Sequence, residues 1–136
     1  RNHGAAAYRA YSYALEGKYP QALALLRKGE SPESLKNLTF LSQRGYLAAR
    51  CNDKQVLDDT LNRIVAHKDH PNYTAERAII ASAQGDFDLL VEEIERHYLN
   101  GHIAYVHSLI SNPFLAPVLK EPRVQVIVKK MRPYTE

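Results

Sequence analysis

His67, Asp69 and His70 form the most compact group of possible metal ligands in the sequence. Two histidines three residues apart on a helix can share one ion, and the Asp69 carboxylate can add an oxygen ligand. The group comes immediately before Pro71, however, where a helix is expected to end. Polar side chains at such an end usually cap the helix in solvent, so we expect a polar turn rather than a metal site.

Three further histidines, His97, His102 and His107, are spaced by five residues. A step of five rotates around a helix instead of following one face, and Gly101 interrupts the series. A shared metal site is therefore not expected. Because imidazole changes its charge near neutral pH, His102 or His107 at a helix interface could instead sense pH, and we keep this as a hypothesis.

The sequence contains no arrangement typical of an enzyme. Cys51 has no base placed to activate it, so a structural thiol is expected. Glu92, Glu93 and Glu95 are consistent with a solvated helix face. Glycine-rich phosphate loops, Gly-x-Ser-x-Gly elbows and His-Glu-x-x-His pairs do not occur. We therefore expect no enzyme activity, no metal and no cofactor.

The composition indicates one globular, helical domain. Apolar residues make up 45% and charged residues 24% of the 136 residues, and abundant Ala and Leu favour helix over strand. The net charge is +3, with basic residues scattered except for Lys129, Lys130 and Arg132. Phosphate binding needs a clustered basic stripe, so direct binding of nucleic acid is not expected.

Neither the apolar runs nor the N-terminus indicates a membrane or secretory segment. No run of about 18 apolar residues occurs, so we expect no membrane insertion. A single cysteine, Cys51, argues against a disulfide-stabilised secreted domain. The first residues, Arg1 to Gly4, include neither an initiator Met nor the layout of a signal peptide. We interpret residues 1–136 as a single domain that is a fragment of a longer protein.

Three similar turns recur along the chain. They begin at Gly17, Asn52 and Gly85, so they are 35 and 33 residues apart. The apolar residues on each side follow a helical spacing, and Gly or Asn at the turn is typical of a left-handed helix C-cap. Asp53 and Asp86 are suited to begin the following helix. Each turn is therefore predicted to join two antiparallel helices.

The same patterns predict an all-α fold of successive hairpins. Ser31 followed by Pro32 suits the start of the third helix, because proline is accepted in a first turn. The predicted helices are 4–16, 19–28, 32–50, 53–67, 72–84, 87–99, 102–111 and 121–131. They group into hairpins at 4–28, 32–67 and 72–99, and a C-terminal hairpin and cap at 102–131.

The repeated segments resemble tetratricopeptide repeats, whose period is about 34 residues. Lys54 departs from the family pattern, which has an aromatic residue there, and Leu57 and Leu90 replace a small residue. The resemblance implies a right-handed superhelical stack of antiparallel hairpins, a tetratricopeptide-like α-solenoid. The positions that carry it are the small residues and the aromatics that follow the turns: Ala10, Gly45, Ala78, Tyr19 and Phe87.

The segment 112–124 resembles the close of the tetratricopeptide region in bacterial winged-helix transcriptional regulators and adenylate cyclase-like sensors. Glu121 and Val124 stand where that pattern has Asp and Phe. The resemblance implies that this chain is the regulatory part of a bacterial transcriptional regulator. The chain would then be cytoplasmic, or periplasmic if its parent protein is anchored in a membrane. The last helix is expected to cap the open end of the stack with an apolar face, which consists of Val124, Ile127, Val128 and Met131. Its basic residues, Lys129, Lys130 and Arg132, are expected to point outward.

In tetratricopeptide proteins the first helices form a concave groove, which implies a binding role for this surface. Aromatic residues and Arg anchor interfaces more than other types. We expect the partner to be a protein, a peptide or another domain of the same chain; a small-molecule-sensing domain and a homo-oligomerisation domain are alternatives. The family register brings six residues toward the groove: Tyr11, Ser42, Tyr46, Arg50, Ile79 and Ser82.

Overall fold

The structure, a computed structural model, describes the backbone of residues 3–135 and the side chains of residues 8–131. Within that range the chain is helical and contains no β-strand, which confirms the all-α prediction. The α-helices are α1 (His3–Leu15), α2 (Tyr19–Lys28), α3 (Leu38–Arg50), α4 (Lys54–Ile64), α5 (Tyr73–Ala83), α6 (Asp88–Leu99), α7 (Ile103–Ile110) and α8 (Pro122–Thr135). The 3-10 helices are η1 (Ser34–Lys36), η2 (Val65–His67) and η3 (Pro113–Lys120).

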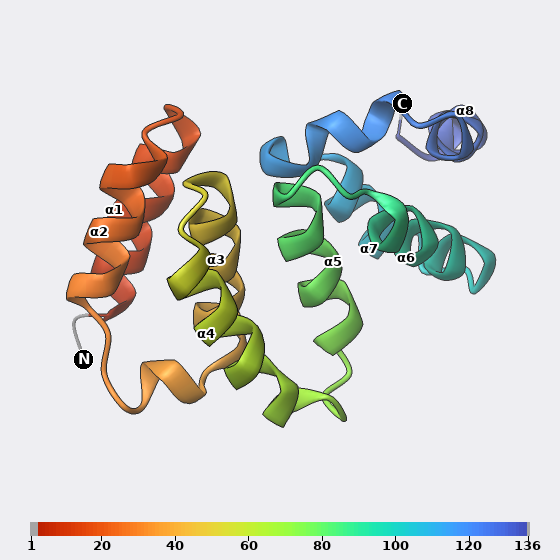
Figure 1. Cartoon of the computed structure of the whole chain (residues 1–136). Helices are drawn as coiled ribbons and strands as arrows, with labels where there is room; N and C mark the ends of the chain where they lie inside the picture. The colour runs from red at the N-terminus through yellow and green to blue at the C-terminus, as the bar shows by residue number, and fades with distance from the viewer. Residues whose placement is uncertain (1–2, 136) are drawn as a thin grey trace.

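Helices that follow one another along the chain also pack against one another. The pairs α1 with α2, α3 with α4 and α5 with α6 are in contact, and α3 additionally contacts α5. Figure 1 shows α1 and α2 at one side of the molecule, α3, α4 and α5 in the middle, and α6, α7 and α8 at the other side. No helix within residues 3–135 combines the length and the apolar character needed to cross a membrane.

The predicted left-handed turns are present. Gly17 has a φ of 78° and Asn52 a φ of 56°, a region that glycine adopts freely and asparagine tolerates. After Gly17, the N–H of Lys18 donates to the carbonyl of Tyr13 at 3.0 Å, which closes the helix end in the Schellman pattern. Asp53 caps α4 by accepting a first-turn N–H at 3.2 Å. Positive φ also occurs at Gly85 and Gly101.

The predicted helix 32–50 is wrong at its start. Ser31 and Ser34 bond reciprocally, each backbone N–H donating to the other's hydroxyl oxygen at 2.8 and 3.0 Å, and this closes a turn around η1. Asn37 is extended, and its side chain accepts the N–H of Phe40 at 2.9 Å. Because short polar side chains compete with the helix for backbone groups, α3 begins only at Leu38.

Other parts of the chain also differ from the prediction, and α8 extends to Thr135, beyond the predicted end at 131. The α-helix predicted at 53–67 ends at Ile64 and continues as the 3-10 helix η2. The segment between the predicted helices 102–111 and 121–131 is itself ordered as η3. Pro117 lies inside η3, and its missing N–H prevents a regular α-helical ladder through this segment.

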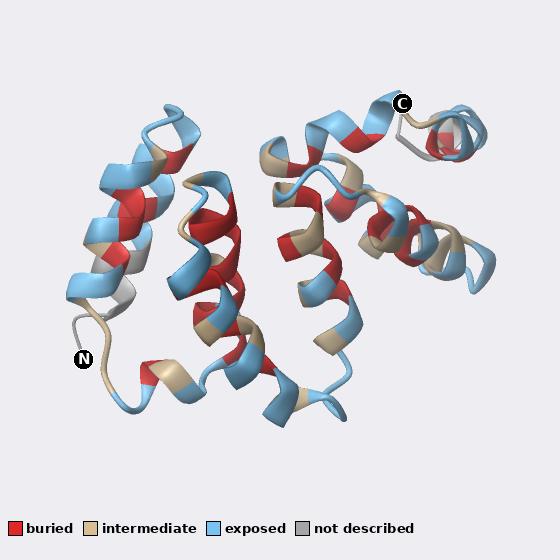
Figure 2. Ribbon diagram, viewed as in Figure 1, coloured by how far each residue is buried: buried red, intermediate tan, exposed pale blue. Residues whose placement is uncertain are grey.

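The buried side chains form two neighbouring cores. The first lies among α1, α2, α3 and α4 and includes Ile80 of α5, whereas the second lies among α6, α7, η3 and α8 and includes Ala78 of α5. Ile79 packs against both cores. Figure 2 shows the buried residues on the sides of the helices that face one another. Helix α5 is therefore the element that the two halves share.

Gly45 allows α3 to approach α4 and α5 closely. A Cβ atom at this position would lie 2.6 Å from Cδ1 of Ile80 on α5 and 3.2 Å from Cγ2 of Thr60 on α4. Close-packed protein interiors do not accommodate a 2.6 Å carbon contact without displacement. The small residue expected on the third helix thus lies where α3 meets both of its neighbours.

A buried arginine ties α3 to α4 and to the end of α2. The Arg44 side chain is 5% exposed; its Nε donates to Glu30 at 2.7 Å, and Nη1 donates to Asp59 at 2.8 Å and Thr60 at 2.7 Å. The Arg63 guanidinium, with Arg44 beside it, holds the pKa of Asp59 below its usual range. A charge this deeply buried needs such partners, because an unpaired one costs several kcal/mol, on the order of 3–5.

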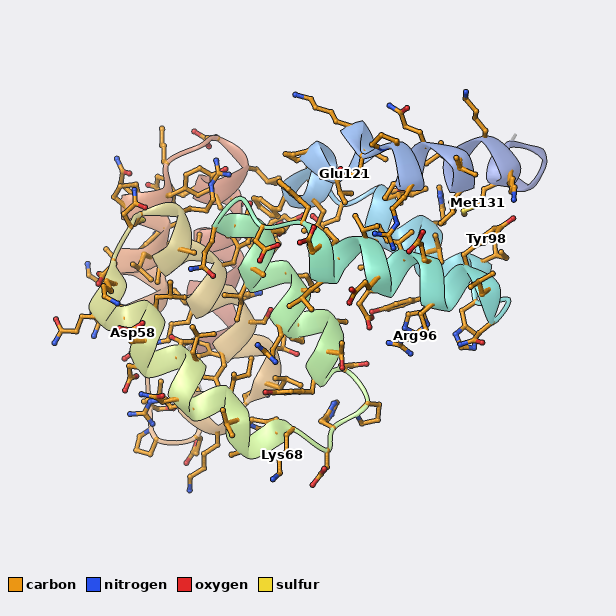
Figure 3. The ribbon with its side chains drawn as sticks, turned by 45° about the vertical axis from the view of Figure 1, so that its right-hand side comes forward. Asp58, Lys68, Arg96, Tyr98, Glu121 and Met131 are labelled. Atoms are coloured by element: carbon orange, nitrogen blue, oxygen red, sulfur yellow. The ribbon has the colours of Figure 1, made fainter. Side chains whose placement is uncertain are left out.

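The last helix buries the face predicted for it. Val124, Ile127 and Met131 are buried, whereas Lys129 and Lys130 are exposed; the side chain of Arg132 lies outside the described residues. Figure 3 shows Met131 directed from α8 toward α6, which carries Tyr98. An ion pair between Arg123 of α8 and Glu95 of α6, with Nε 3.0 Å from Oε2, also joins the two helices.

Gly45→Ala is expected to destabilise the fold, although the helix propensity of alanine is better than that of glycine by about 1 kcal/mol. The added methyl meets Cδ1 of Ile80, and overpacking a buried site commonly costs about 1–3 kcal/mol. Ile80→Val removes that atom, so the cost of Gly45→Ala should be about 1 kcal/mol smaller in the Ile80→Val background. Urea unfolding of the four proteins measures this coupling. Strictly additive free energies of unfolding would contradict the contact.

Candidate functional site

A cavity of about 170 Å³ lies between α1, α3, α5 and the start of η3. Its walls come from two alanines and a tyrosine of α1, from one face of α3, from one residue of α5, and from Asn112 and Phe114 at the start of η3. The helices are held around it by the close approach at Gly45. The lining residues are Ala10, Tyr11, Ala14, Ser42, Gln43, Tyr46, Leu47, Ile79, Asn112 and Phe114.

Three aromatic rings form one side of this cavity. The ring of Phe114 lies between those of Tyr11 and Tyr46, at 5.3 Å from each, with interplanar angles of 83° and 61°. These are edge-to-face arrangements, which aromatic pairs prefer to direct stacking. The Tyr46 hydroxyl also donates a hydrogen bond to the Phe114 carbonyl at 3.3 Å. A residue from the C-terminal part of the chain therefore occupies the space between two tyrosines of the N-terminal part.

The Tyr46 hydroxyl is held in its protonated form. Burial, with a smaller contribution from Tyr19, raises the pKa of Tyr46 to about 12. Tyr19 lies 6.5 Å from the Tyr46 ring, and the guanidinium of Arg50 stacks over Tyr19 at 4.5 Å from the ring centroid. At physiological pH Tyr46 is therefore a neutral donor on an otherwise aromatic wall.

The local structure of η3 brings Phe114 into the cavity. Asn112 is extended, and its side chain accepts the N–H of Phe114 at 2.9 Å, so this donor is satisfied within its own turn. Leu115 and Val118 are fully buried in the second core and anchor the rest of the helix. Only the Phe114 side chain of this stretch reaches across to pack against the first core.

Four of the six residues predicted for the groove line this one cavity: Tyr11, Ser42, Tyr46 and Ile79. The other two are not part of its wall. Arg50 is exposed and stacks on Tyr19. Ser82 is buried, and its hydroxyl donates to the carbonyl of Ile79 at 2.6 Å, so its hydrogen bond is made within α5.

Six lining residues were not assigned to the groove from the sequence, and two of them, Asn112 and Phe114, come from the C-terminal part of the chain. The other four are Ala10, Ala14, Gln43 and Leu47. The pattern at 112–124 indicated a cap on the end of the stack, and it carried no sign of where the Phe114 ring would lie. Tyr46 and Phe114 are 68 positions apart, and a contact over this separation depends on the arrangement of all the intervening helices.

A carboxyl group lies next to the polar end of the cavity. Burial raises the pKa of Glu76 on α5, while a hydrogen bond with Ser42 opposes that rise. Because Ser42 lines the cavity, it connects the aromatic wall to an acidic group on the neighbouring helix. Burial, with smaller contributions from the negative charges of Glu93 and Glu76, raises the pKa of Tyr105 on α7.

The histidines predicted to be separate are partly brought together. Nδ1 of His97 lies 2.9 Å from Nδ1 of His102, and Nε2 of His97 lies 3.3 Å from the buried carboxylate of Glu93. His107 instead contacts Ser111 at 3.4 Å. Among the residues that the structure describes, no group of three or more His, Cys, Asp or Glu is placed to hold a metal ion.

Comparison of the chain with protein-family models, with curated proteins and with solved structures found no significant match. A function for the chain therefore has to be inferred from the geometry of the cavity.

Replacing Tyr46 by Phe is expected to change how stability depends on alkaline pH. The pKa of Tyr46 is about 12 in the folded chain, above the usual value of about 10, so the folded state favours the protonated phenol. This contribution is complete below about pH 10 and is lost as the pH rises toward about 12. Urea unfolding at intervals from about pH 9 to about pH 11.5 should show a smaller loss of stability in Tyr46→Phe. Tyr8→Phe, at an exposed tyrosine, is the control and should behave like the parent; identical profiles for all three would contradict the assignment.

Proposed function

We propose that this chain is a protein-interaction module of the tetratricopeptide type that binds a peptide or protein segment in a groove between α1, α3 and α5. The observation that carries the proposal is the seating of Phe114 between Tyr11 and Tyr46, with a cavity of about 170 Å³ beside it. A surface that holds one aromatic side chain of a polypeptide, and leaves room beside it, has the properties of a peptide-binding site.

The architecture supports the same proposal. Left-handed turns at Gly17, Asn52 and Gly85 separate the helices of each pair at nearly equal intervals. In a right-handed superhelical stack of such pairs, α1, α3 and α5 are the first helices and form the concave face. The cavity lies between these three helices. Tyrosine suits such a face because it offers a large rigid contact area together with a polar hydroxyl.

The resemblance of the segment 112–124 supports a more specific proposal. The chain would be the regulatory part of a bacterial transcriptional regulator, cytoplasmic or, in a membrane-anchored parent, periplasmic. In that setting the groove would hold a protein partner or another domain of the same chain, and signal transduction would pass through it.

The cavity also favours a second candidate function, a small-molecule-sensing domain. A volume near 170 Å³ with apolar walls is close to the roughly 150 Å³ of cavities that bind benzene-sized compounds. A compound that binds only the folded chain raises its melting temperature in a saturable manner. Saturable stabilisation by small aromatic compounds, without any peptide binding, would favour this function over the first.

A third candidate, homo-oligomerisation, has support on α1. Tyr8, Tyr11 and Leu15 follow a spacing of three and four residues, and their exposed fractions are 75%, 44% and 50%. Such an apolar stripe can pair with a second copy. Light scattering that shows a monomer throughout the micromolar range would exclude this function.

Selection of random peptides displayed on phage tests the proposed groove. The parent chain should enrich peptides that carry an aromatic residue, and Tyr11→Ala should weaken their binding about tenfold or more, because aromatic anchors dominate interfaces. Tyr13→Ala is a matched control, since Tyr13 lies on the same helix with 38% exposure against 44% but does not line the cavity. Equal loss in both variants, or unchanged binding in Tyr11→Ala, would contradict the groove.

A further inference from the structure

We infer that the groove binds the phenylalanine side chain of a partner peptide, and that the chain's own Asn112-Pro113-Phe114 occupies the groove as an internal competitor. This inference rests on the proposed function and names both its ligand class and its regulation. The seated segment is part of the same chain, so it shows directly which chemistry the site accepts.

Phe114 differs from its neighbours in where it is anchored. Leu115 and Val118 are fully buried and belong to the second core, while Phe114 is only partly buried and packs against the first. Withdrawal of the Phe114 ring from between Tyr11 and Tyr46 therefore leaves the two core residues of η3 in place. The segment can release the groove without unfolding the C-terminal half.

The backbone of Phe114 also depends little on the groove. Its N–H donates to the Asn112 side chain within the same turn at 2.9 Å, and Pro113 has no N–H. The polar bond to the groove is the one from the Tyr46 hydroxyl to the Phe114 carbonyl, at 3.3 Å. A partner peptide can accept the same bond with its own carbonyl, so the exchange conserves the hydrogen bond.

The internal segment fills the site incompletely. A cavity of about 170 Å³ remains beside the Phe114 ring, and Gln43 of α3, which is not part of the internal segment, is among its lining residues. A side-chain amide can form hydrogen bonds with the backbone of a peptide. A single inserted ring offers no backbone groups for such bonds. A longer extended segment therefore has room for contacts that the internal one does not make.

Pro113 precedes the seated ring, but it is exposed and does not line the cavity, so it acts through the backbone and not through contact with the groove. Proline fixes its own φ and favours an extended residue before it, so a proline–phenylalanine pair presents the ring from a pre-organised backbone. Less conformational freedom is then lost on binding. The ring enters edge-on between Tyr11 and Tyr46, as Phe114 does.

A fluorescent peptide with the sequence of residues 110–118 tests the inference by its anisotropy. It should bind Phe114→Ala at least tenfold more tightly than the parent, because the internal competitor has been removed. Leu119→Ala, an exposed residue of the same η3 segment outside the cavity wall, should bind like the parent. A peptide in which alanine replaces the phenylalanine should not bind either chain, and circular dichroism checks that both variants are folded.

A second measurement uses the intact parent chain, in case Phe114→Ala is poorly folded. With 4-fluorophenylalanine at position 114, addition of the peptide should shift the fluorine resonance, whereas a label at Phe87, which packs in the second core, should not respond. An unchanged resonance at position 114 while the peptide binds would overturn the competition.

The outcomes separate the inference from the function on which it rests. Equal affinity of the peptide for parent and Phe114→Ala would overturn the internal competitor and leave the groove standing. Absence of binding to both, with folded proteins, would overturn the inference, whereas the proposed peptide-binding function would be overturned only if the phage selection also enriched no peptide. If the parent dimerises with concentration while Phe114→Ala remains monomeric, the occupant is the segment of a second copy, and the inference of a partner peptide is wrong.

Discussion

The close approach of α3 to α4 and α5 is the constraint on which the rest of the structure depends. It exists because Gly45 has no Cβ atom where Ile80 and Thr60 converge. Helix α5 in turn contributes to both cores, so the position of the C-terminal half follows from this crossing. Tyr46 and Ile79, which are adjacent in sequence to Gly45 and Ile80, line the cavity between α1, α3 and α5.

Phe114 joins the two halves in a different way. It belongs by sequence to the segment that the second core anchors, yet its ring packs against Tyr11 and Tyr46 of the first half. The ring is only partly buried beside a cavity, whereas Leu115 is fully buried in the second core. The account therefore connects binding to conformation: a ligand that takes the place of the ring also releases one contact between the halves.

Turns and helices could be predicted from the sequence because their causes are local. Gly17 and Asn52 indicated left-handed caps, and apolar spacing indicated the helices. The predicted start of α3 was wrong because Ser31 and Ser34 close a turn of their own around η1, and the extended Asn37 caps the helix instead. Tyr46 and three other lining residues followed from the register of the first helices, whereas the position of Phe114 depends on packing between distant segments, which local patterns do not encode.

An NOE spectrum of the chain with labelled Phe and Tyr rings tests the central claim most directly. The central claim is that the groove exists in the free chain and holds its own aromatic residue. The account predicts cross-peaks from the ring of Phe114 to those of both Tyr11 and Tyr46, which lie 5.3 Å away between centroids. Cross-peaks from Phe114 to neither tyrosine, in a chain that still shows helical circular dichroism, would contradict it.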